Sequence, residues 1–152
     1  MGAVVDRSDW PVVTVAVEEP ADLHVLADEL DAILGEERPF ALSVVAPRDV
    51  DMLQRMLWAA PAARRRLRRQ RLELAAWCEA AAHVLSPIAF QRVVPSVLRN
   101  AELIWGCATL AASTPDEARD LLRVRLGARL EDARRHVGTG PDSPVPVALE
   151  AL

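Results

Sequence analysis

The chain has 152 residues, enough for one domain with a sizeable core, and its 51% hydrophobic and 26% charged residues are typical of a globular protein rather than a disordered one. No apolar run approaches the ~18 residues that cross a bilayer, and no secretion signal opens the chain, so we expect a soluble, cytoplasmic protein. Two cysteines, Cys78 and Cys107, are too few for a disulfide framework or a cysteine-based zinc site, and we expect both to be reduced.

The net charge of −4 conceals an uneven distribution along the chain. Residues 1–60 contain 4 Arg and 12 Asp or Glu, a balance of −8, whereas residues 61–152 contain 14 Arg and 10 acids, a balance of +4. The basic part alone would suggest a polyanionic partner. The acidic part argues against a nucleic-acid footprint spread over the whole domain.

The first half of the chain predicts an alternation of strand and helix. Val12–Val17 is β-branched, apolar and bounded by prolines, which indicates a strand covered on both faces. Pro20–Glu36 predicts a helix that stops near Gly35, and Phe40–Val45 predicts a second strand. Residues 47–60 have a mixed pattern that indicates a short helix or turn. The apolar face of the first helix consists of Leu23, Leu26, Leu30, Ile33 and Leu34.

The residues from Pro61 to Ala80 predict one long helix, opened by a proline at a favoured first position. Its apolar stripe has helical spacing and consists of Ala63, Leu67, Leu74 and Cys78, with Gln70 in the remaining slot. The opposite side carries Arg64, Arg65, Arg66, Arg68, Arg69 and Arg71. We expect a central helix that covers the sheet with its stripe and turns a cationic back to solvent.

Strand and helix alternate in the second half as well. Ala82–Leu85 predicts a third strand, and Cys107–Ala112 predicts a fourth strand of small residues. Between them, Ile88–Ile104 is mostly helical, but Pro95 lacks the amide proton and must kink or divide the helix. Such an order favours a layered sheet with helical cover, an α/β fold.

Thr114-Pro115-Asp116-Glu117 is the clearest local signal, because Thr114 can cap the amide of Glu117 and Glu117 can return a bond. The helix that follows ends near Gly138, and its stripe consists of Ala118, Leu122, Leu126, Leu130 and Ala133. We divide the chain into an α/β domain over residues 1–137 and a Gly/Pro-rich tail over residues 138–152.

Several stretches occur in the same order as in a known family. They are Asp9-Trp10-Pro11, Arg38-Pro39-Phe40-Ala41-Leu42, the Arg-rich helix ending near Trp77-Cys78, and Ser113-Thr114-Pro115-Asp116-Glu117-Ala118. Over roughly residues 8–126 the chain resembles the STAS / SpoIIAA-like family, particularly its bacterial stand-alone single-domain members. The resemblance implies a sandwich in which a mixed sheet of four or five strands is covered by helices mainly on one side.

The resemblance also implies protein–protein interaction rather than catalysis. The best understood relatives are anti-sigma-factor antagonists, which bind a partner kinase and are switched by phosphorylation of a Ser or Thr near the helix after the second strand. Here residues 46–51 contain no hydroxyl to carry the phosphate, and Ser43 is expected within a strand. An aspartate common at the end of that strand in stand-alone members is replaced by Val45-Ala46. We therefore expect no phosphoswitch.

Three interpretations of the arginine run remain open. The first is a solvated back of the helix, partly paired with Glu73, and the second is a surface that binds an acidic protein or a second copy of the chain. The third is a binding site for nucleic acid or membrane headgroups. No aromatic residue alternates with the arginines as a stacking platform for bases, which argues against nucleic acid. The residues that we expect to contact a partner include Arg64, Arg65, Arg68 and Arg69.

Catalytic and metal-binding residues are not indicated. The soft-metal or nucleophile candidates are Cys78, Cys107, His24, His83 and His136, and no motif sets a thiol beside an oriented base. We expect no catalytic residue, no metal and no cofactor. Most of the large residues Trp10, Trp58, Trp77, Trp105, Met52, Met56 and Leu57 should be core or core rim.

Two further segments are candidates for an interface. Trp58 lies in an irregular segment just before the arginine helix. The tail is either a frayed terminus or a segment that adds to a sheet edge or groove of a partner through Val145, Val147 and Leu149. Taken together, the sequence predicts a non-enzymatic STAS-like interaction domain that self-associates, as a homodimer, or docks to another bacterial protein, without nucleic acid or membrane as partner. The alternative is a small-molecule-binding STAS-like protein, or a protein with lost or cryptic catalysis, with a pocket between sheet and helices lined by Trp58, Met56 and Trp105.

Overall fold

The computed structural model describes residues 4–49, 51–52, 55, 61–89, 91–92, 99 and 105–138. Beyond residue 129, the only side chain described is that of Glu131. Within the described part, no helix has both the length and the apolarity needed to cross a membrane.

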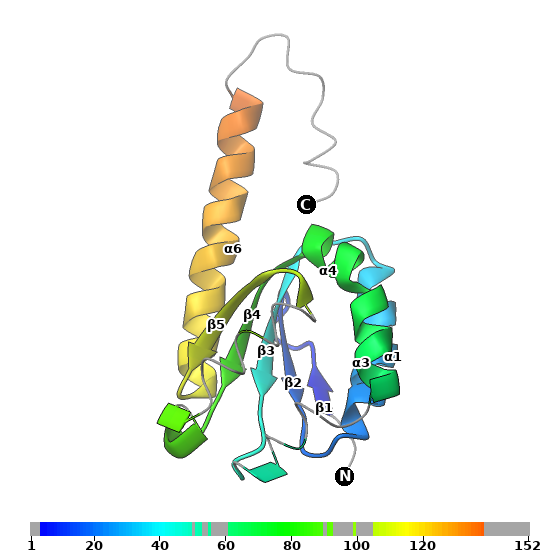
Figure 1. Ribbon diagram of the computed structural model, residues 1–152. Helices are drawn as coiled ribbons and strands as arrows, with labels where there is room; N and C mark the ends of the chain where they lie inside the picture. Colours follow the sequence, from blue (N-terminus) through cyan, green and yellow to red (C-terminus); the bar gives the residue numbers. More distant parts are fainter. Residues whose placement is uncertain are drawn as a thin grey trace.

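A mixed sheet of five strands forms the centre of the molecule (Figure 1). The strands are β1 (Val4–Asp6), β2 (Val12–Ala16), β3 (Phe40–Val45), β4 (Cys78–Val84) and β5 (Ala108–Ala112), and they lie in chain order across the sheet. β1 pairs with β2 in antiparallel orientation, and β2 to β5 are parallel. This confirms an α/β fold with a mixed sheet.

Helices cover both faces of the sheet (Figure 1). α1 (Asp22–Leu34), α3 (Pro61–Arg69) and α4 (Arg71–Trp77) lie on one face, and α6 (Pro115–Gly138) lies on the other. The strands β2, β3 and β4 are parallel and follow one another across the sheet in the same direction. Because crossover connections between parallel strands are right-handed, the helices of the two connections, α1 and then α3 with α4, lie on the same face. α6 follows the last described strand and packs against the opposite face. The resemblance implied helices mainly on one side of the sheet, and it did not predict the helix layer that α6 forms on the other side.

Each face of the sheet has its own hydrophobic core. The core under α1, α3 and α4 includes Val13, Val15, Leu42 and Leu67 from strands and helices. The core under α6 includes Val12, Ala41, Ala80, Ala82 and Leu122. Residues of β2 and β3 enter both cores, which explains why these strands are apolar except for Thr14 and Ser43 and confirms the predicted cover on both faces of β2.

The prediction of one helix from Pro61 to Ala80 is wrong at its C-terminal end. α3 ends at Arg69, a turn at Gln70 leads into α4, and β4 already begins at Cys78. The Ala-rich sequence has high helix propensity, but pairing with β3 and β5 and burial on both faces override it. The predicted strand Ala82–Leu85 is therefore only the second half of β4.

The first helix and second strand were predicted well. β3 has the predicted bounds, and α1 buries its predicted face except for Leu23, which is half-buried. α1 stops at Leu34, but Gly35 keeps a right-handed helical conformation and the positive φ of 50° occurs at Glu37. The strand β1 was missed because three residues are too few for a pattern.

The predicted cap of α6 is confirmed, with one change. The Glu117 amide donates to Thr114 Oγ1 at 3.1 Å, and Ala118, Leu122 and Leu126 of the stripe are buried. The Glu117 carboxylate accepts from the Ser113 amide and hydroxyl, at 3.0 and 2.7 Å, rather than from the Thr114 amide. These hydrogen bonds from Ser113 lower the pKa of Glu117.

Several predicted elements lie wholly or largely outside the described residues. These are the mixed segment 47–60, the helix 88–104 with Pro95, and the tail 138–152. The predicted strand Cys107–Ala112 corresponds to β5, which begins one residue later.

Candidate interaction surface

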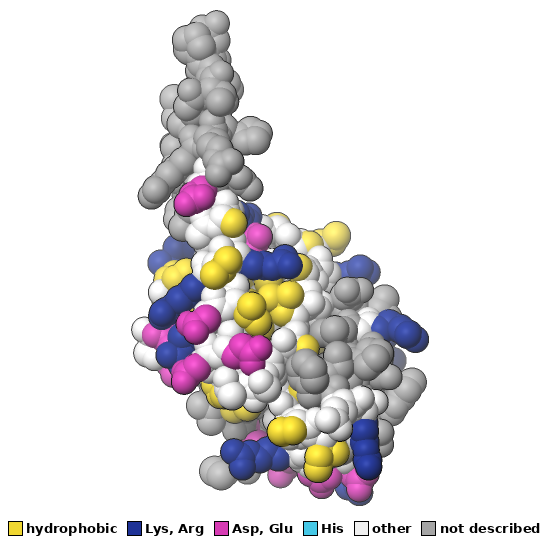
Figure 2. Space-filling view, turned by 90° about the vertical axis from the view of Figure 1, so that its left-hand side faces the viewer, with side chains coloured by type: hydrophobic (Ala, Val, Ile, Leu, Met, Phe, Trp, Pro, Cys, Tyr) yellow, Lys and Arg dark blue, Asp and Glu magenta, His cyan; other side chains and the backbone are white. Residues whose placement is uncertain are grey.

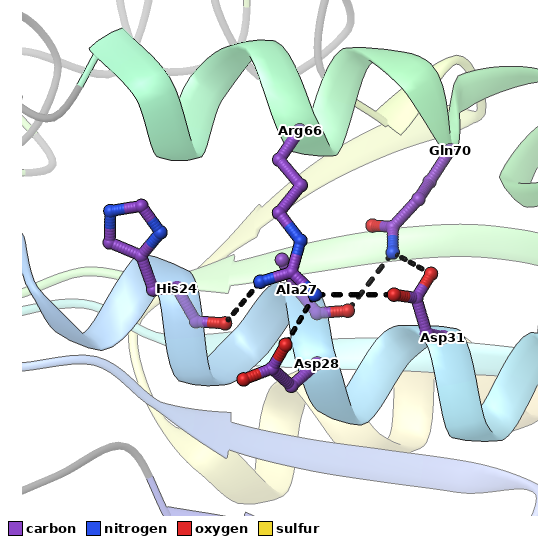
Figure 3. Close-up of polar contacts among 6 residues, drawn as sticks. All are labelled: His24, Ala27, Asp28, Asp31, Arg66 and Gln70. Atoms are coloured by element: carbon purple, nitrogen blue, oxygen red, sulfur yellow. Dashed lines mark hydrogen bonds and ion pairs between the residues drawn. The ribbon is translucent and has the colours of Figure 1, made fainter.

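Arg66 fixes α3 against α1 by an exposed network of hydrogen bonds and ion pairs (Figure 3). Its guanidinium contacts the Asp28 carboxylate and lies 3.3 Å from Asp31, while Nη1 donates to the His24 carbonyl oxygen at 3.4 Å. The hydrogen bond to Asp28 is the main cause that raises the pKa of Arg66. The prediction that Arg66 belongs to the solvent-facing back is therefore wrong. Its position one residue before Leu67 of the stripe could have indicated this contact.

Gln70 completes the same junction one turn further along (Figure 3). It is 6% exposed, and its Nε2 donates to the Ala27 carbonyl oxygen at 2.9 Å and to the Asp31 carboxylate. In the sequence, Gln70 occupies a position of the apolar stripe, and no hydrogen-bond partner for its side chain is evident. The structure explains the polar residue at this position, because α1 provides hydrogen-bond acceptors for the Gln70 amide.

The remaining α3 arginines form a cationic surface. Arg65, Arg68 and Arg69 are exposed, Arg64 is half-buried, and none of them has an ion-pair partner in the described part of the chain, so the expected pairing with Glu73 is not found there. Leu72, three and four residues after Arg69 and Arg68, is 85% exposed at the start of α4. We call these five residues the arginine face.

The structure does not describe the other predicted contact residues. Trp58, Val145, Val147 and Leu149 lie outside the described residues. The expectation that the large aromatic residues are core or core rim is confirmed for those described: Trp105 is 4% exposed, and Trp10 and Trp77 are half-buried against the first core.

His83 and Trp105 form a buried polar pair that the sequence did not indicate. Trp105 Nε1 donates to His83 Nε2 at 3.1 Å, which assigns the imidazole proton to Nδ1. Burial lowers the pKa of His83 to about 4, so the ring is neutral near pH 7. Trp105 is also one of the three residues of the pocket that the small-molecule hypothesis predicts, and that pocket stays a prediction. Met56 and Trp58, the other residues of that hypothesis, lie outside the described part.

The described residues form a pocket of about 290 Å³. It lies at the carboxyl ends of β3, β4 and β5 and is lined by Val45, Val84, Ser86 and Ser113, among others. Ser86 donates to the Arg48 carbonyl oxygen at 3.3 Å, and Ser113 donates to Glu117, so both hydroxyls already have partners. Carboxyl ends of parallel strands are where open α/β sheets bind ligands.

No metal site is formed by the described residues, since they contain no group of three or more His, Cys, Asp or Glu side chains that could hold an ion.

The face that carries α6 mixes scattered hydrophobic side chains with charges of both signs (Figure 2). Two of its exposed hydrophobic residues are Leu121 and Val124, at 38% and 72%.

Comparison with known proteins found no match: no protein-family model, no curated protein and no solved structure is similar enough to place the chain in a family.

Proposed function

We propose that this protein is a non-enzymatic, STAS-like protein–protein interaction domain that docks an acidic protein surface through its arginine face. The observation that carries the proposal is a set of α3 arginines that have no ion-pair partner in the described part of the chain, followed at the start of α4 by a leucine that is 85% exposed. An isolated exposed leucine is ordinary. An exposed leucine that closely follows unpaired arginines in the sequence suits an interface, whose core is typically apolar and enriched in arginine.

The chemistry of the partner follows from these side chains. Guanidinium groups bind carboxylates with two parallel hydrogen bonds, so the partner presents Asp or Glu side chains around an apolar residue that covers Leu72. The rigid contact between α3 and α1 supports such binding, because Arg66 and Gln70 hold the helix in one orientation and less order is lost on association. The acidic segment 1–60 of a second copy is one surface of this kind, and in that case the protein self-associates as a homodimer.

The test is affinity capture from extracts of the source cells with three purified chains, followed by mass spectrometry. The first is the natural protein, and the second carries Arg65→Glu and Arg68→Glu. The third carries Arg92→Glu and Arg125→Glu, which change the charge equally at exposed positions outside α3. We expect at least one acidic protein, or the chain itself, to be retained by the first and third chains and lost by the second.

Two results would refute the proposal. One is the same set of captured proteins for all three chains. The other is capture that disappears after nuclease treatment of the extract, which would instead make nucleic acid the ligand of the arginine face. Sedimentation of the purified chain at low salt identifies the homodimer, which the Arg65→Glu and Arg68→Glu changes should dissociate.

A second candidate function, binding of a small molecule, is favoured by the pocket at the carboxyl ends of β3, β4 and β5. At about 290 Å³ it suits a compact metabolite rather than a dinucleotide. Enlarging Ala46, one of its lining residues, to Leu should abolish any ligand-induced rise in the melting temperature. A ligand that stabilises the Ala46→Leu chain as well as the natural one would exclude this pocket.

A further inference from the structure

The two cysteines lie side by side in the fold although 29 positions separate them in the sequence. Cys78 is the first residue of β4, and Cys107 directly precedes β5, the neighbouring parallel strand. Their Sγ atoms are 3.8 Å apart, and both thiols are free in the structure.

The backbone around Cys107 supports this approach. Gly106 has φ of +67°, a conformation that glycine adopts without strain. A Cβ at Gly106 would lie 2.6 Å from Cγ of Arg71, so the start of α4 packs directly on this turn. The turn therefore holds Cys107 next to the strand in which Cys78 is anchored by pairing with Phe40 of β3.

The two thiols differ in exposure and acidity. Cys78 is buried, while Cys107 is only half-buried. The hydrogen bond with the Cys78 thiol lowers the pKa of Cys107, against the opposing effects of partial burial and of Glu79. The same bond and full burial raise the pKa of Cys78. Cys107 is therefore the thiol that ionises first and meets a reagent from solvent.

We propose that Cys78 and Cys107 are a reversible oxidation site, at which a low-molecular-weight disulfide converts the two thiols into an intramolecular disulfide between β4 and β5. With a disulfide bond length of about 2.0 Å, the sulfur atoms must approach each other by less than 2 Å, which is within the range of side-chain rotation. In a reducing compartment the pair stays in the dithiol form, and it closes when the thiol pool becomes oxidised.

The exchange balances with glutathione disulfide as oxidant. The Cys107 thiolate attacks one sulfur of the reagent, forms a mixed disulfide and releases one glutathione thiolate, which takes up the proton lost by Cys78. The Cys78 sulfur then attacks the Cys107 sulfur, forms the protein disulfide and releases the second glutathione. Two protein thiols are oxidised, and one glutathione disulfide is reduced to two thiols.

The test uses the full chain in buffers of graded glutathione redox ratio, with thiol titration and mass spectrometry of the non-reduced peptides. We expect both thiols to disappear together, a cross-linked peptide pair containing Cys78 and Cys107, and recovery of both thiols after dithiothreitol. The oxidised chain should melt about 10 °C higher, because the bond closes a loop of roughly 30 residues in the unfolded chain. Closure should be at least about tenfold faster in native buffer than in urea, since folding holds the sulfurs together.

Two variants assign the roles of the cysteines. Cys107→Ser should prevent reaction with the reagent, and Cys78→Ala should stop at a stable mixed disulfide on Cys107. The proposal is overturned if the natural chain keeps two free thiols in excess glutathione disulfide. It is equally overturned if the reaction ends at the mixed disulfide or at a cross-link between two chains, or if closure is no faster in native buffer than in urea. These readouts need only the natural chain, so a variant that fails to fold does not affect them.

Discussion

Stability should depend on pH through the buried histidine of β4. His83 is 7% exposed, its Nε2 accepts the Trp105 indole proton, and burial lowers its pKa from 6.5 to about 4. Protonation would desolvate a cation and would also replace the acceptor at Nε2 by a second donor. His83 therefore binds a proton more weakly in the folded protein than in the unfolded chain.

The sign and size of the effect follow from these two pKa values. Above pH 6.5 the imidazole is neutral in both states, and stability is complete. As the pH falls from 6.5 to about 4, only the unfolded chain takes up the proton, so stability is lost, and below pH 4 the loss stays constant. At ~1.4 kcal/mol per pKa unit the total loss is about 3 kcal/mol, of which about 2 kcal/mol occurs between pH 8 and pH 5.

Urea denaturation at pH 8 and pH 5 measures this loss. The natural chain and His83→Gln should be compared, because glutamine can accept the Trp105 hydrogen bond but does not titrate. We expect the natural chain to lose about 2 kcal/mol more than the variant between these pH values. Equal losses in the two chains would refute the assignment of a buried, neutral histidine.

Four further substitutions test the packing, each by urea denaturation at pH 8. Gly106→Ala should destabilise the protein by roughly 2 kcal/mol, because Gly106 has a positive φ and the added Cβ would meet the Arg71 side chain. Gly127→Ala should stabilise it by up to about 1 kcal/mol, because nothing lies within 4 Å of the added Cβ. A change of the same sign in both variants would contradict this. Thr114→Ala removes the cap of α6 and should cost about 1 kcal/mol, and an unchanged stability would mean that the cap is redundant. Leu122→Ala should cost roughly 2–5 kcal/mol, since Leu122 is fully buried between α6 and the sheet; a loss below about 1 kcal/mol would mean that α6 does not cover this face.

The parts of the fold that could be predicted are those encoded by local pattern. β3 has the bounds that its apolar run indicates, and the Thr114 cap forms because its partners are three residues apart. The start of β4 could not be predicted in the same way. Cys78 to Ala82 favour a helix locally, and only the neighbouring strands β3 and β5 turn them into a strand.

In the candidate sites too, local patterns could be predicted and contacts between distant segments could not. Four of the six arginines assigned to the cationic back lie on the arginine face, because their positions follow from helical periodicity. Arg66 did not follow it, since its position depends on the carboxylates of α1, more than 30 residues earlier in the chain. The His83–Trp105 contact and the proximity of Cys78 and Cys107 also join distant segments, and no local pattern announces such pairs.

Docking through the arginine face is tested most directly by arginine footprinting of the complex. A dicarbonyl reagent that modifies exposed arginines is applied to the free chain and to the chain bound to its captured partner, and each site is quantified by mass spectrometry. We predict that modification of Arg65, Arg68 and Arg69 falls at least about fivefold in the complex, whereas Arg92 and Arg125, which are also exposed, react as before. Unchanged modification on α3, or protection confined to Arg125 on α6, would contradict the account.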